Sequence, residues 1–313
     1  MKIVFMGTPE FAVTILDGII KDGLEIVGVI TAPDKPAGRG RQINQSAVKQ
    51  YTVENNLTVL QPTNLKDEGF ISELKDLKAD LFVVVAFRML PEVVWSMPPK
   101  GTINLHASLL PNYRGAAPIN WAIINGEQET GVTTFFIEKD IDTGNIIDYD
   151  IIQITPNMTA GTLHDALATK GKETMLRTIY NIKANTVIAT PQNTIRLTDR
   201  QNAPKIFKED CLVDWNKQAK ETDDFIRGLS PYPAAWSKLE KDGKIFTCKL
   251  FNSSTTNIYS KELTKVLVDE GFLFPCKDKY IRIEELQLEG KRRMTWKEFS
   301  AGNRIEDFSL IIE

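Results

Sequence analysis

The sequence lacks the cysteine patterns and long apolar runs that mark several common classes of protein. It has three cysteines, Cys211, Cys248 and Cys276, and because no two of them have CxxC spacing they fit neither a zinc knuckle nor a disulfide framework. No stretch reaches the ~20 consecutive apolar residues of a membrane span. The first residues have the pattern of a strand and a turn rather than that of a signal peptide. We therefore expect reduced thiols, no contact with a membrane and a cytoplasmic protein.

Motifs for nucleotide binding and for acyl-enzyme hydrolysis are missing as well. The sequence has neither GxGxxG nor GxxxxGK[ST], so a site for a dinucleotide or a nucleoside triphosphate loses its usual support. Ser108 does not lie in a GxSxG elbow, which argues against a serine nucleophile. The formal net charge is -3. This excludes binding to nucleic acid through overall positive charge, so any such contact requires a local basic patch.

The length and the pattern of apolar residues predict two domains. A chain of 313 residues is long enough for two cores, since a domain usually takes ~100 to 200 residues. Its first part alternates short apolar runs with amphipathic stretches, which is typical of an α/β fold with a mostly parallel, Rossmann-like sheet. The run 81–86 is wholly apolar, as in a strand covered on both faces. Strands are expected at 3–6, 25–31, 81–86, 103–106, 131–137 and 146–152.

The later part of the chain has a different pattern. After Cys211 one helix is expected at 218–229, and alternating segments at 236–239, 245–250 and 280–283 are separated by glycine and polar turns. Short strands at close spacing predict a small OB-like β-barrel, a module that often contacts oligonucleotides. We therefore divide the chain into an α/β domain (1–190), a linker (191–208) and a C-terminal β-barrel domain (209–313).

An amide and an imidazole lie two residues apart at the end of a predicted strand. Asn104 and His106 alternate with the apolar residues Ile103 and Leu105, so both polar side chains point to one face of the sheet. The carboxyl edge of an open α/β sheet is where such folds bind ligands. Two converging donors suit acyl transfer to an amine, because each preorganised donor aimed at the developing oxyanion contributes ~3 kcal/mol. A single histidine is more often structural, and it is this context that favours a functional role.

Asp142 lies in an Asp-Thr-Gly segment and has two interpretations. Taken alone, the segment is a polar turn between two strands. Together with Asn104 and His106, the same carboxylate orients an imidazole or accepts a proton. The sequence alone favours the turn.

A basic loop follows the second predicted strand. Between residues 34 and 42 it places Lys35, Arg39 and Arg41 with two glycines. A solvated turn and a contact with nucleic acid are equally open interpretations. Arg39 lies between the two glycines, so little bulk keeps it from a phosphate. A second basic cluster, 291–293, is more simply a solvated turn.

These motifs together resemble one family, the methionyl-tRNA formyltransferases, over the whole chain. The block 104–111, with its Asn-x-His and Ser-Leu-Leu-Pro, is shared by enzymes of this fold that use 10-formyltetrahydrofolate. The Gly-Arg-Gly loop at 38–40 and the C-terminal half narrow the resemblance to the tRNA enzymes. The matching segments are 4–12, 33–40, 104–111, 113–119, 142–144, 203–206, 231–236 and 290–294.

The resemblance implies transfer of a formyl group from 10-formyltetrahydrofolate to the α-amine of methionine on initiator tRNA, for initiation of translation. It places Asn104, His106 and Asp142 as the catalytic residues. Asn104 and a protonated His106 stabilise the tetrahedral oxyanion, while Asp142 orients the imidazole and passes protons. No metal and no covalent enzyme intermediate are implied.

The resemblance also implies where the two substrates bind. The pterin of the folate lies against the backbone at 84–91, the basic loop enters the acceptor end of the tRNA, and the barrel follows the tRNA backbone. We expect a monomer. The implied folate contacts are Val84, Leu90, Ser108, Leu109, Leu110 and Pro111, and the implied tRNA contacts are Lys35, Arg39 and Arg41.

The chain departs from the family pattern in the segment before Leu90-Pro91. Family members often have Ala-Tyr-Gly there, whereas this chain has Ala86-Phe87-Arg88 followed by Met89. The change concerns the side chains that line the donor pocket and not the reaction. Arg41 stands where lysine is common, which keeps the charge.

Other functions remain open from the sequence. A formyltransferase acting on a small amine such as a sugar nucleotide, or a hydrolase releasing formate from the same donor, would use Asn104, His106 and Asp142 without needing the basic loop. An RNA-binding module that has lost catalysis would not need the three residues at all.

Overall fold

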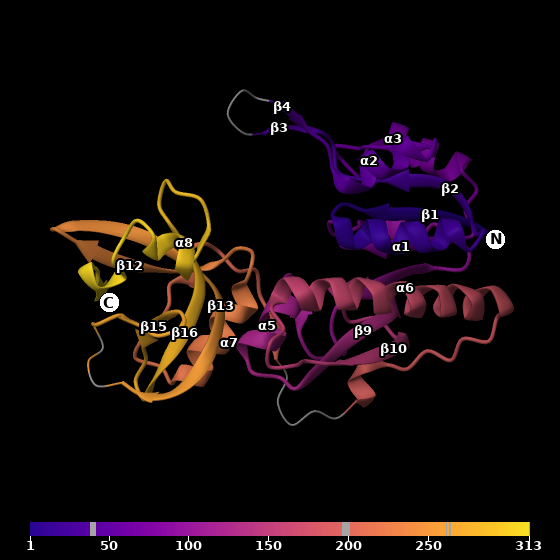
Figure 1. The fold of residues 1–313 in the computed structure, drawn as a ribbon. Helices are drawn as coiled ribbons and strands as arrows, with labels where there is room; N and C mark the ends of the chain where they lie inside the picture. The colour runs from indigo at the N-terminus through magenta and orange to yellow at the C-terminus, as the bar shows by residue number, and fades with distance from the viewer. Residues whose placement is uncertain (38–41, 196–200, 261, 263, 313) are drawn as a thin grey trace. The chain divides into compact units, whose positions relative to one another are not determined.

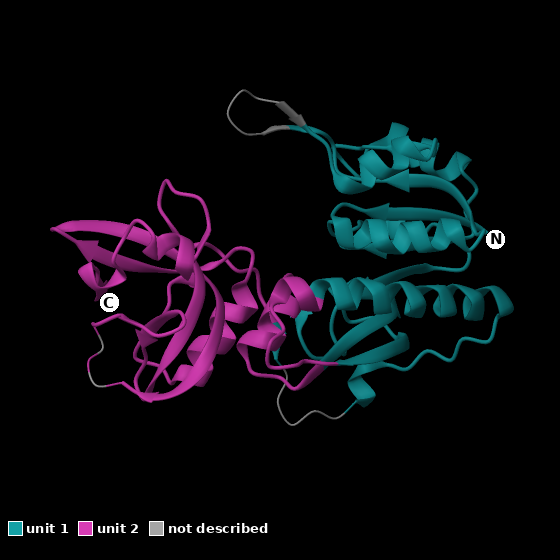
Figure 2. Ribbon diagram, viewed as in Figure 1, with its two compact units in different colours: residues 1–115, 130–152, 164–202 teal, residues 116–129, 153–163, 203–313 magenta. Residues whose placement is uncertain are grey.

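The structure, a computed structural model, describes residues 1–37, 42–195, 201–260, 262 and 264–312. The chain forms two compact units, which Figure 2 draws in different colours. The sequence predicts domains that are each one continuous stretch of the chain, and these boundaries stay a prediction. The units differ from that simple division because unit 2 includes two segments from before residue 164. Unit 1 comprises 1–115, 130–152 and 164–202, and unit 2 comprises 116–129, 153–163 and 203–313.

Unit 1 is built on a seven-stranded sheet with the order β10-β9-β7-β6-β1-β2-β5 (Figure 1). The strands β7, β6, β1, β2 and β5 run parallel to one another, and β9 runs antiparallel to β7. The mostly parallel, Rossmann-like sheet predicted from the sequence is confirmed. Its strand β6 is buried throughout, which explains the unbroken apolar run. The strands are β1 (Lys2–Gly7), β2 (Glu25–Ile30), β5 (Val59–Leu60), β6 (Leu81–Val85), β7 (Thr102–His106), β9 (Glu129–Phe136) and β10 (Ile146–Gln153).

The helices α2 and α3 of unit 1 begin at capping side chains. Ser46 Oγ accepts a hydrogen bond from the Lys49 N–H at 3.0 Å, and Asp67 Oδ1 accepts one from the Phe70 N–H at 3.0 Å. Each cap satisfies a backbone donor that the first turn of a helix leaves unpaired. The helices that lie wholly or mostly in unit 1 are α1 (Glu10–Lys21), α2 (Ala47–Glu54), α3 (Glu68–Asp76), α4 (Glu92–Trp95), α6 (Ala160–Ala184) and the 3-10 turn η1 (Gln192–Thr194).

Unit 2 contains an antiparallel sheet with the order β14-β15-β16-β13-β12-β18, and β17 pairs with β16. The sheet curls on itself, because the Leu310 N–H donates to the Thr264 carbonyl at 3.0 Å and thereby joins β18 to the segment before β14. The predicted small barrel is confirmed in this curled form. Its strands are β12 (Ala235–Lys241), β13 (Lys244–Tyr259), β14 (Leu267–Val268), β15 (Phe272–Pro275), β16 (Lys279–Leu288), β17 (Met294–Thr295) and β18 (Ser309–Ile311), and its helices are α5 (Pro118–Ile124), α7 (Ala219–Leu229) and α8 (Trp296–Ser300).

A buried ion network ties helix α7 to another segment of unit 2. The Arg227 Nε donates to Asp223 Oδ2 at 3.1 Å, and the same guanidinium bonds the Asp224 carboxylate and the Met158 carbonyl. All three charged side chains are buried. The contact to Met158 joins the segment 153–163 to helix α7.

Candidate functional site

The order of the strands in unit 1 reverses between β1 and β6. From β1 the chain moves outward to β2, which is labelled beside it in Figure 1, and to β5. It then returns to the other side of β1 as β6, followed by β7. Ligands of open α/β sheets bind at the carboxyl ends of the strands beside such a reversal, because the connecting loops diverge there. Here these strands end at Gly7 (β1), Val85 (β6) and His106 (β7).

Strand β7 brings Asn104 and His106 to this edge of the sheet. Asn104 pairs in register with Val84 of β6, and His106 pairs with Thr133 of β9. One residue separates the two in a regular strand, so their side chains share a face. The Asn104 side chain is partly exposed, and no described residue provides a hydrogen-bond partner for its amide. That amide is therefore available to a bound molecule.

The imidazole of His106 is held by the backbone. Its Nε2 lies 2.8 Å from the carbonyl oxygen of Tyr113. Since a carbonyl oxygen only accepts, Nε2 carries a proton, and Nδ1 is the nitrogen that faces Asp142. Nδ1 lies 3.9 Å from Asp142 Oδ2, which is within reach of an ion pair but too long for a hydrogen bond.

Asp142 lies on a tightly constrained turn. Its φ is 54°, in the left-handed region that few residues other than glycine adopt. Its Oδ2 accepts a hydrogen bond from the Gly115 N–H at 3.1 Å. Two residues later, a Cβ on Gly144 would overlap the carbonyl oxygen of Phe136, so only glycine allows this approach. The turn predicted for the Asp-Thr-Gly segment and the carboxylate directed at His106 are therefore the same structure.

Gln192 joins the turn of Asp142 to Arg114. This buried side chain donates from Nε2 to the carbonyls of Asp142 at 3.0 Å and Gly144 at 2.8 Å. Its Oε1 accepts from Arg114 Nε at 3.1 Å. No motif in the sequence marks Gln192, because a glutamine in a polar segment has no pattern that separates it from a solvated one.

The loop after β7 is fixed by a second hydroxyl that the sequence does not mark. Thr133 Oγ1 in β9 donates to the Ser108 carbonyl at 2.6 Å and accepts from the Leu110 N–H at 3.1 Å. Ser108 Oγ donates to the Asn112 carbonyl at 2.7 Å. Ser108, Leu110 and Pro111 are buried, and Leu109 is partly exposed. The Ser108 hydroxyl therefore supports the loop.

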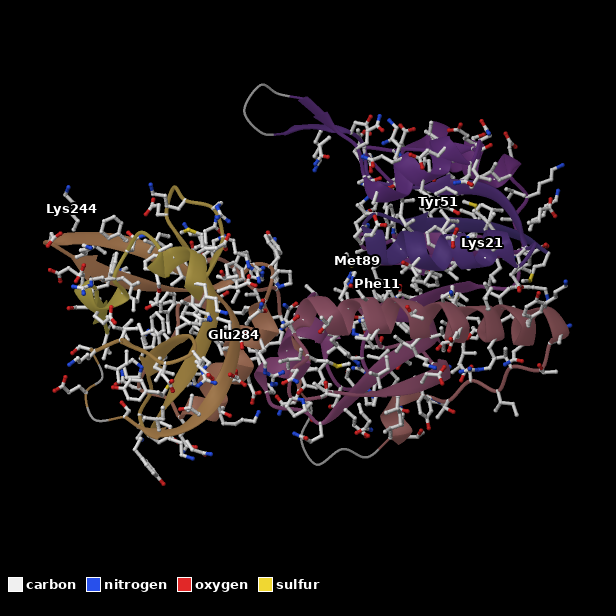
Figure 3. All side chains as sticks on the ribbon, viewed as in Figure 1. Phe11, Lys21, Tyr51, Met89, Lys244 and Glu284 are labelled. Carbon is white, nitrogen blue, oxygen red and sulfur yellow. The ribbon has the colours of Figure 1, made fainter. Side chains whose placement is uncertain are left out.

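The segment after β6 shows how the chain accommodates its departure from the family pattern. Val84 and Leu90 are buried in the core of unit 1. The Arg88 guanidinium donates to the Thr63 carbonyl at 2.9 Å and also to that of Pro62, so it is engaged with the loop that follows β5. Met89, labelled in Figure 3, is 73% exposed.

The residues predicted to contact nucleic acid are described only in part. Lys35 is exposed at the start of β3 (Lys35–Ala37), which pairs with β4 (Gln42–Asn44) as a hairpin. Arg39 and Arg41 lie outside the described residues. At the base of the hairpin, Lys49 pairs with Asp34, and this hydrogen bond lowers the pKa of the Asp34 carboxyl.

The described ranges contain no group of three or more histidine, cysteine or acidic side chains arranged to hold a metal ion. No helix in the same ranges is long and apolar enough to cross a membrane.

Two family models and several curated proteins that match this chain carry formyltransferase names. The formyl transferase family model matches residues 1–179, and the model of the formyl transferase C-terminal domain matches residues 205–304. A methionyl-tRNA formyltransferase of Flavobacterium johnsoniae is 52% identical over 309 residues, which cover 98% of each chain. One of Bacteroides thetaiotaomicron is 48% identical over 320 residues, covering 98% of this chain and 97% of that protein.

Solved structures with a similar fold are more distant in sequence. HypX from Aquifex aeolicus in complex with tetrahydrofolic acid has a TM-score of 0.66 at 19% identity, covering 95% of this chain and 46% of that one. An N-formyltransferase from Helicobacter canadensis, in complex with folinic acid and dTDP-3-aminofucose, has a TM-score of 0.66 at 22% identity, covering 94% and 100%. At these identities the likeness concerns the fold alone.

Proposed function

This chain belongs to the methionyl-tRNA formyltransferases, and on that premise we propose that it transfers the formyl group of 10-formyltetrahydrofolate to the α-amine of methionine on charged initiator tRNA. The observation that carries the proposal is the group formed by Asn104, His106 and Asp142 at the carboxyl end of β7. An amide without a described partner, an imidazole and a carboxylate are the groups that such a transfer requires.

Asn104 and His106 stabilise the charge that develops on the formyl oxygen. When the methionine amine attacks the formyl carbon, the carbonyl electron pair moves to oxygen and a tetrahedral oxyanion forms. The Asn104 amide donates to this oxygen, and an imidazolium at His106 donates from Nδ1 while Nε2 stays on the Tyr113 carbonyl. Donors fixed before the reaction are effective because they need no reorganisation as the charge appears.

Asp142 accepts and returns the protons that move during the transfer. The attacking amine must lose a proton, and the folate nitrogen must gain one when the bond between it and the formyl carbon breaks. The carboxylate accepts the first proton and, through the imidazole or a water molecule, supplies the second. Transfer therefore ends with the site in its starting protonation state, with neither a metal nor a covalent enzyme intermediate in the sequence of steps.

The folate binds along the ends of β6 and β7. We assign its pterin to the backbone beside Val84 and Leu90 and its formyl-bearing end to the loop Ser108, Leu109, Leu110 and Pro111. Thr133 holds this loop by two hydrogen bonds to its backbone. A loop fixed in this way can hold the ligand in one position relative to the catalytic groups. The exposed Met89 lies next to Leu90 at the rim of this region.

The tRNA binds through Lys35, Arg39 and Arg41, with unit 2 following its backbone. If the cations contact phosphates, Arg39→Ala raises the KM for tRNA and lowers the salt slope of log(kcat/KM) by about one, with the KM for the folate unchanged. Lys66→Ala, which removes another exposed lysine of unit 1, is the matched control and leaves both quantities unchanged. An Arg39→Ala enzyme with wild-type activity at every salt concentration would exclude the phosphate contact.

The deciding experiment supplies 10-formyltetrahydrofolate labelled in its formyl group. The acceptors are methionyl initiator tRNA, methionyl elongator tRNA, free methionine and a nucleotide-linked amino sugar. Label on the initiator species in preference to the others supports the proposal, and its loss in Asp142→Asn but not in Asp140→Asn, an exposed neighbour in the same turn, ties it to the site. Label on the sugar amine, or release of formate alone, overturns the proposed acceptor.

Oligomeric state and compartment follow from the same proposal. We propose a monomer that acts in the cytoplasm, where charged tRNA is consumed by translation. Sedimentation at the concentration of the activity assay checks the first point, and a dimer there would contradict it. Localisation of the tagged chain in cells checks the second.

A further inference from the structure

We propose that Gln192 is a positioning residue that fixes the Asp142 carboxylate relative to the His106 imidazole. The inference rests on the proposed function, because it deepens the assignment of these two groups. Gln192 lies in η1, far in the sequence from either of them, and its side chain is 2% exposed. A buried amide of this kind must have all its hydrogen-bonding groups satisfied, or it destabilises the fold.

The orientation of the Gln192 amide follows from its partners. Carbonyl oxygens only accept and a guanidinium only donates, so Nε2 must face the carbonyls of Asp142 and Gly144 while Oε1 faces Arg114. Reversing the amide would oppose acceptor to acceptor and donor to donor. The side chain therefore has one allowed orientation and holds two carbonyls of the turn at once.

These bonds complete a ring around the site. On one side, the consecutive residues 113–115 hold His106 through the Tyr113 carbonyl and Asp142 Oδ2 through the Gly115 N–H. On the other side, Gln192 connects Arg114 of the same segment to the backbone of Asp142. Without Gln192, the hydrogen bonds among the described residues that attach the turn to this segment would be reduced to the one at the Asp142 carboxylate, which is the group that must also accept a proton.

The expected effect is on turnover rather than on binding. Gln192 does not touch the formyl donor or the amine, so its removal leaves both KM values within about twofold. A misplacement of a catalytic group by about 1 Å costs up to ~100-fold in rate. We therefore expect Gln192→Leu to lower kcat by about 10- to 100-fold. Gln192→Glu keeps an acceptor for Arg114 but has no donor for the two carbonyls, so its kcat falls by a similar factor. Asn193→Ala, in the same turn but exposed, is the matched control with unchanged kcat.

A double-mutant cycle separates positioning from general damage. If Gln192 acts through Asp142, then Asp142→Asn combined with Gln192→Leu is about as slow as Asp142→Asn alone, since nothing remains to be positioned. Losses that multiply, or a kcat of Gln192→Glu within twofold of the wild type, would overturn the inference. Gln192→Glu is nearly isosteric and provides the cycle if Gln192→Leu does not fold.

A structural readout keeps this test independent of the acceptor. The Gly115 amide donates to Asp142 Oδ2, so displacement of the carboxylate shifts its proton resonance upfield and speeds its hydrogen exchange. These changes in Gln192→Glu, and their absence in Asn193→Ala, support the inference even if the wild-type chain formylates some other amine. An unchanged Gly115 amide in Gln192→Glu would overturn it even if methionyl-tRNA is the substrate.

Discussion

Thr133→Val tests whether one buried hydroxyl holds the loop assigned to the folate. Valine has nearly the same shape as threonine, so the change removes only the hydrogen bonds of Thr133 Oγ1 to the Ser108 carbonyl and the Leu110 N–H. Both backbone groups lie in a buried part of the loop. A buried polar group left without a partner costs ~1 to 3 kcal/mol. For two such groups, partly relieved by relaxation, we expect a loss of about 2 to 4 kcal/mol in the free energy of unfolding of unit 1.

The loss is expected to appear in folate binding as well. If displacement of the loop at 108–111 weakens folate binding by about 1 kcal/mol, the KM for 10-formyltetrahydrofolate rises about fivefold, since 1.4 kcal/mol is a factor of ten. The KM for tRNA does not change. The assay combines urea unfolding followed by far-ultraviolet circular dichroism with initial rates at varied folate concentration.

Thr134→Val is the matched control. Thr134 is the next residue of β9 and points to the opposite face, where its Oγ1 lies 2.7 Å from the hydroxyl of Thr178 in α6. Its removal also destabilises a buried site, by about 1 to 2 kcal/mol, but it leaves the loop after β7 untouched. An equal increase of the folate KM in the two variants would refute the argument, because it would show that loss of stability alone explains the effect.

The remaining predictions concern Asn104, the turn of Asp142 and the buried ion network of unit 2. Asn104→Ala lowers kcat/KM by about 100- to 1,000-fold, the usual effect of removing one oxyanion donor, and retention of more than half the activity in the formyl-transfer assay would contradict its role. Gly144→Ala forces the Asp142 turn away from the Phe136 carbonyl, so kcat falls while the folate KM does not. Gly302→Ala, where a Cβ has open space, is the matched control with unchanged kcat. Arg227→Met leaves the buried Asp223 carboxylate without its cation and Asp224 with Lys220 alone, and it lowers the stability of unit 2 by about 3 to 5 kcal/mol, measured by urea unfolding with tryptophan fluorescence. Lys220→Ala, which removes a largely exposed partner of Asp224, costs no more than about 1 kcal/mol. Burial raises the pKa of the Asp223 carboxyl, and Ser253 and Arg227 oppose that rise. The folded state therefore holds this proton more tightly than the unfolded state, so the stability contribution of Asp223 falls as the pH rises through its raised pKa. The loss of stability caused by Arg227→Met accordingly shrinks as the pH is lowered into the range where carboxyl groups take up protons. A deficit that grows on acidification would refute this sign.

The fold was predictable where periodicity is a direct consequence of burial. The strand β6 is covered on both faces and is apolar throughout, whereas β12 alternates because one face packs on the core of unit 2. Such patterns can be recognised directly in the sequence. The packing of α5 with α7 could not be predicted in this way, because it depends on contacts such as that of the Asn120 side chain with the Gly228 carbonyl, 108 residues apart. Side-chain bonds at that separation leave no periodic signal.

The site was predictable to the extent that one strand and one turn carry it. Asn104 and His106 share a face because of their spacing in β7, so their convergence required no knowledge of the rest of the chain. The turn and the catalytic interpretations of Asp142 were alternatives in the sequence, and they are compatible because one conformation makes the turn and brings the carboxylate within 3.9 Å of the His106 imidazole. Thr133 and Gln192 were missed because they act through backbone groups of other segments, and a carbonyl is the same in every residue.

The segment 113–115 shows why such contacts matter for the chemistry. Its three consecutive residues hold the imidazole, the glutamine and the carboxylate, and two of these bonds come from the backbone of Tyr113 and Gly115. Both residues have positive φ, 57° at Tyr113 and 126° at Gly115, so the conformation of this segment directs a carbonyl at His106 and an N–H at Asp142. The distance between the His106 and Asp142 side chains therefore depends on backbone geometry outside both of them, in addition to the Gln192 bonds to the Asp142 turn. It follows that a substitution at Gly115 that restricts φ should disturb His106 and Asp142 together, whereas a change in either side chain leaves the support of the other in place.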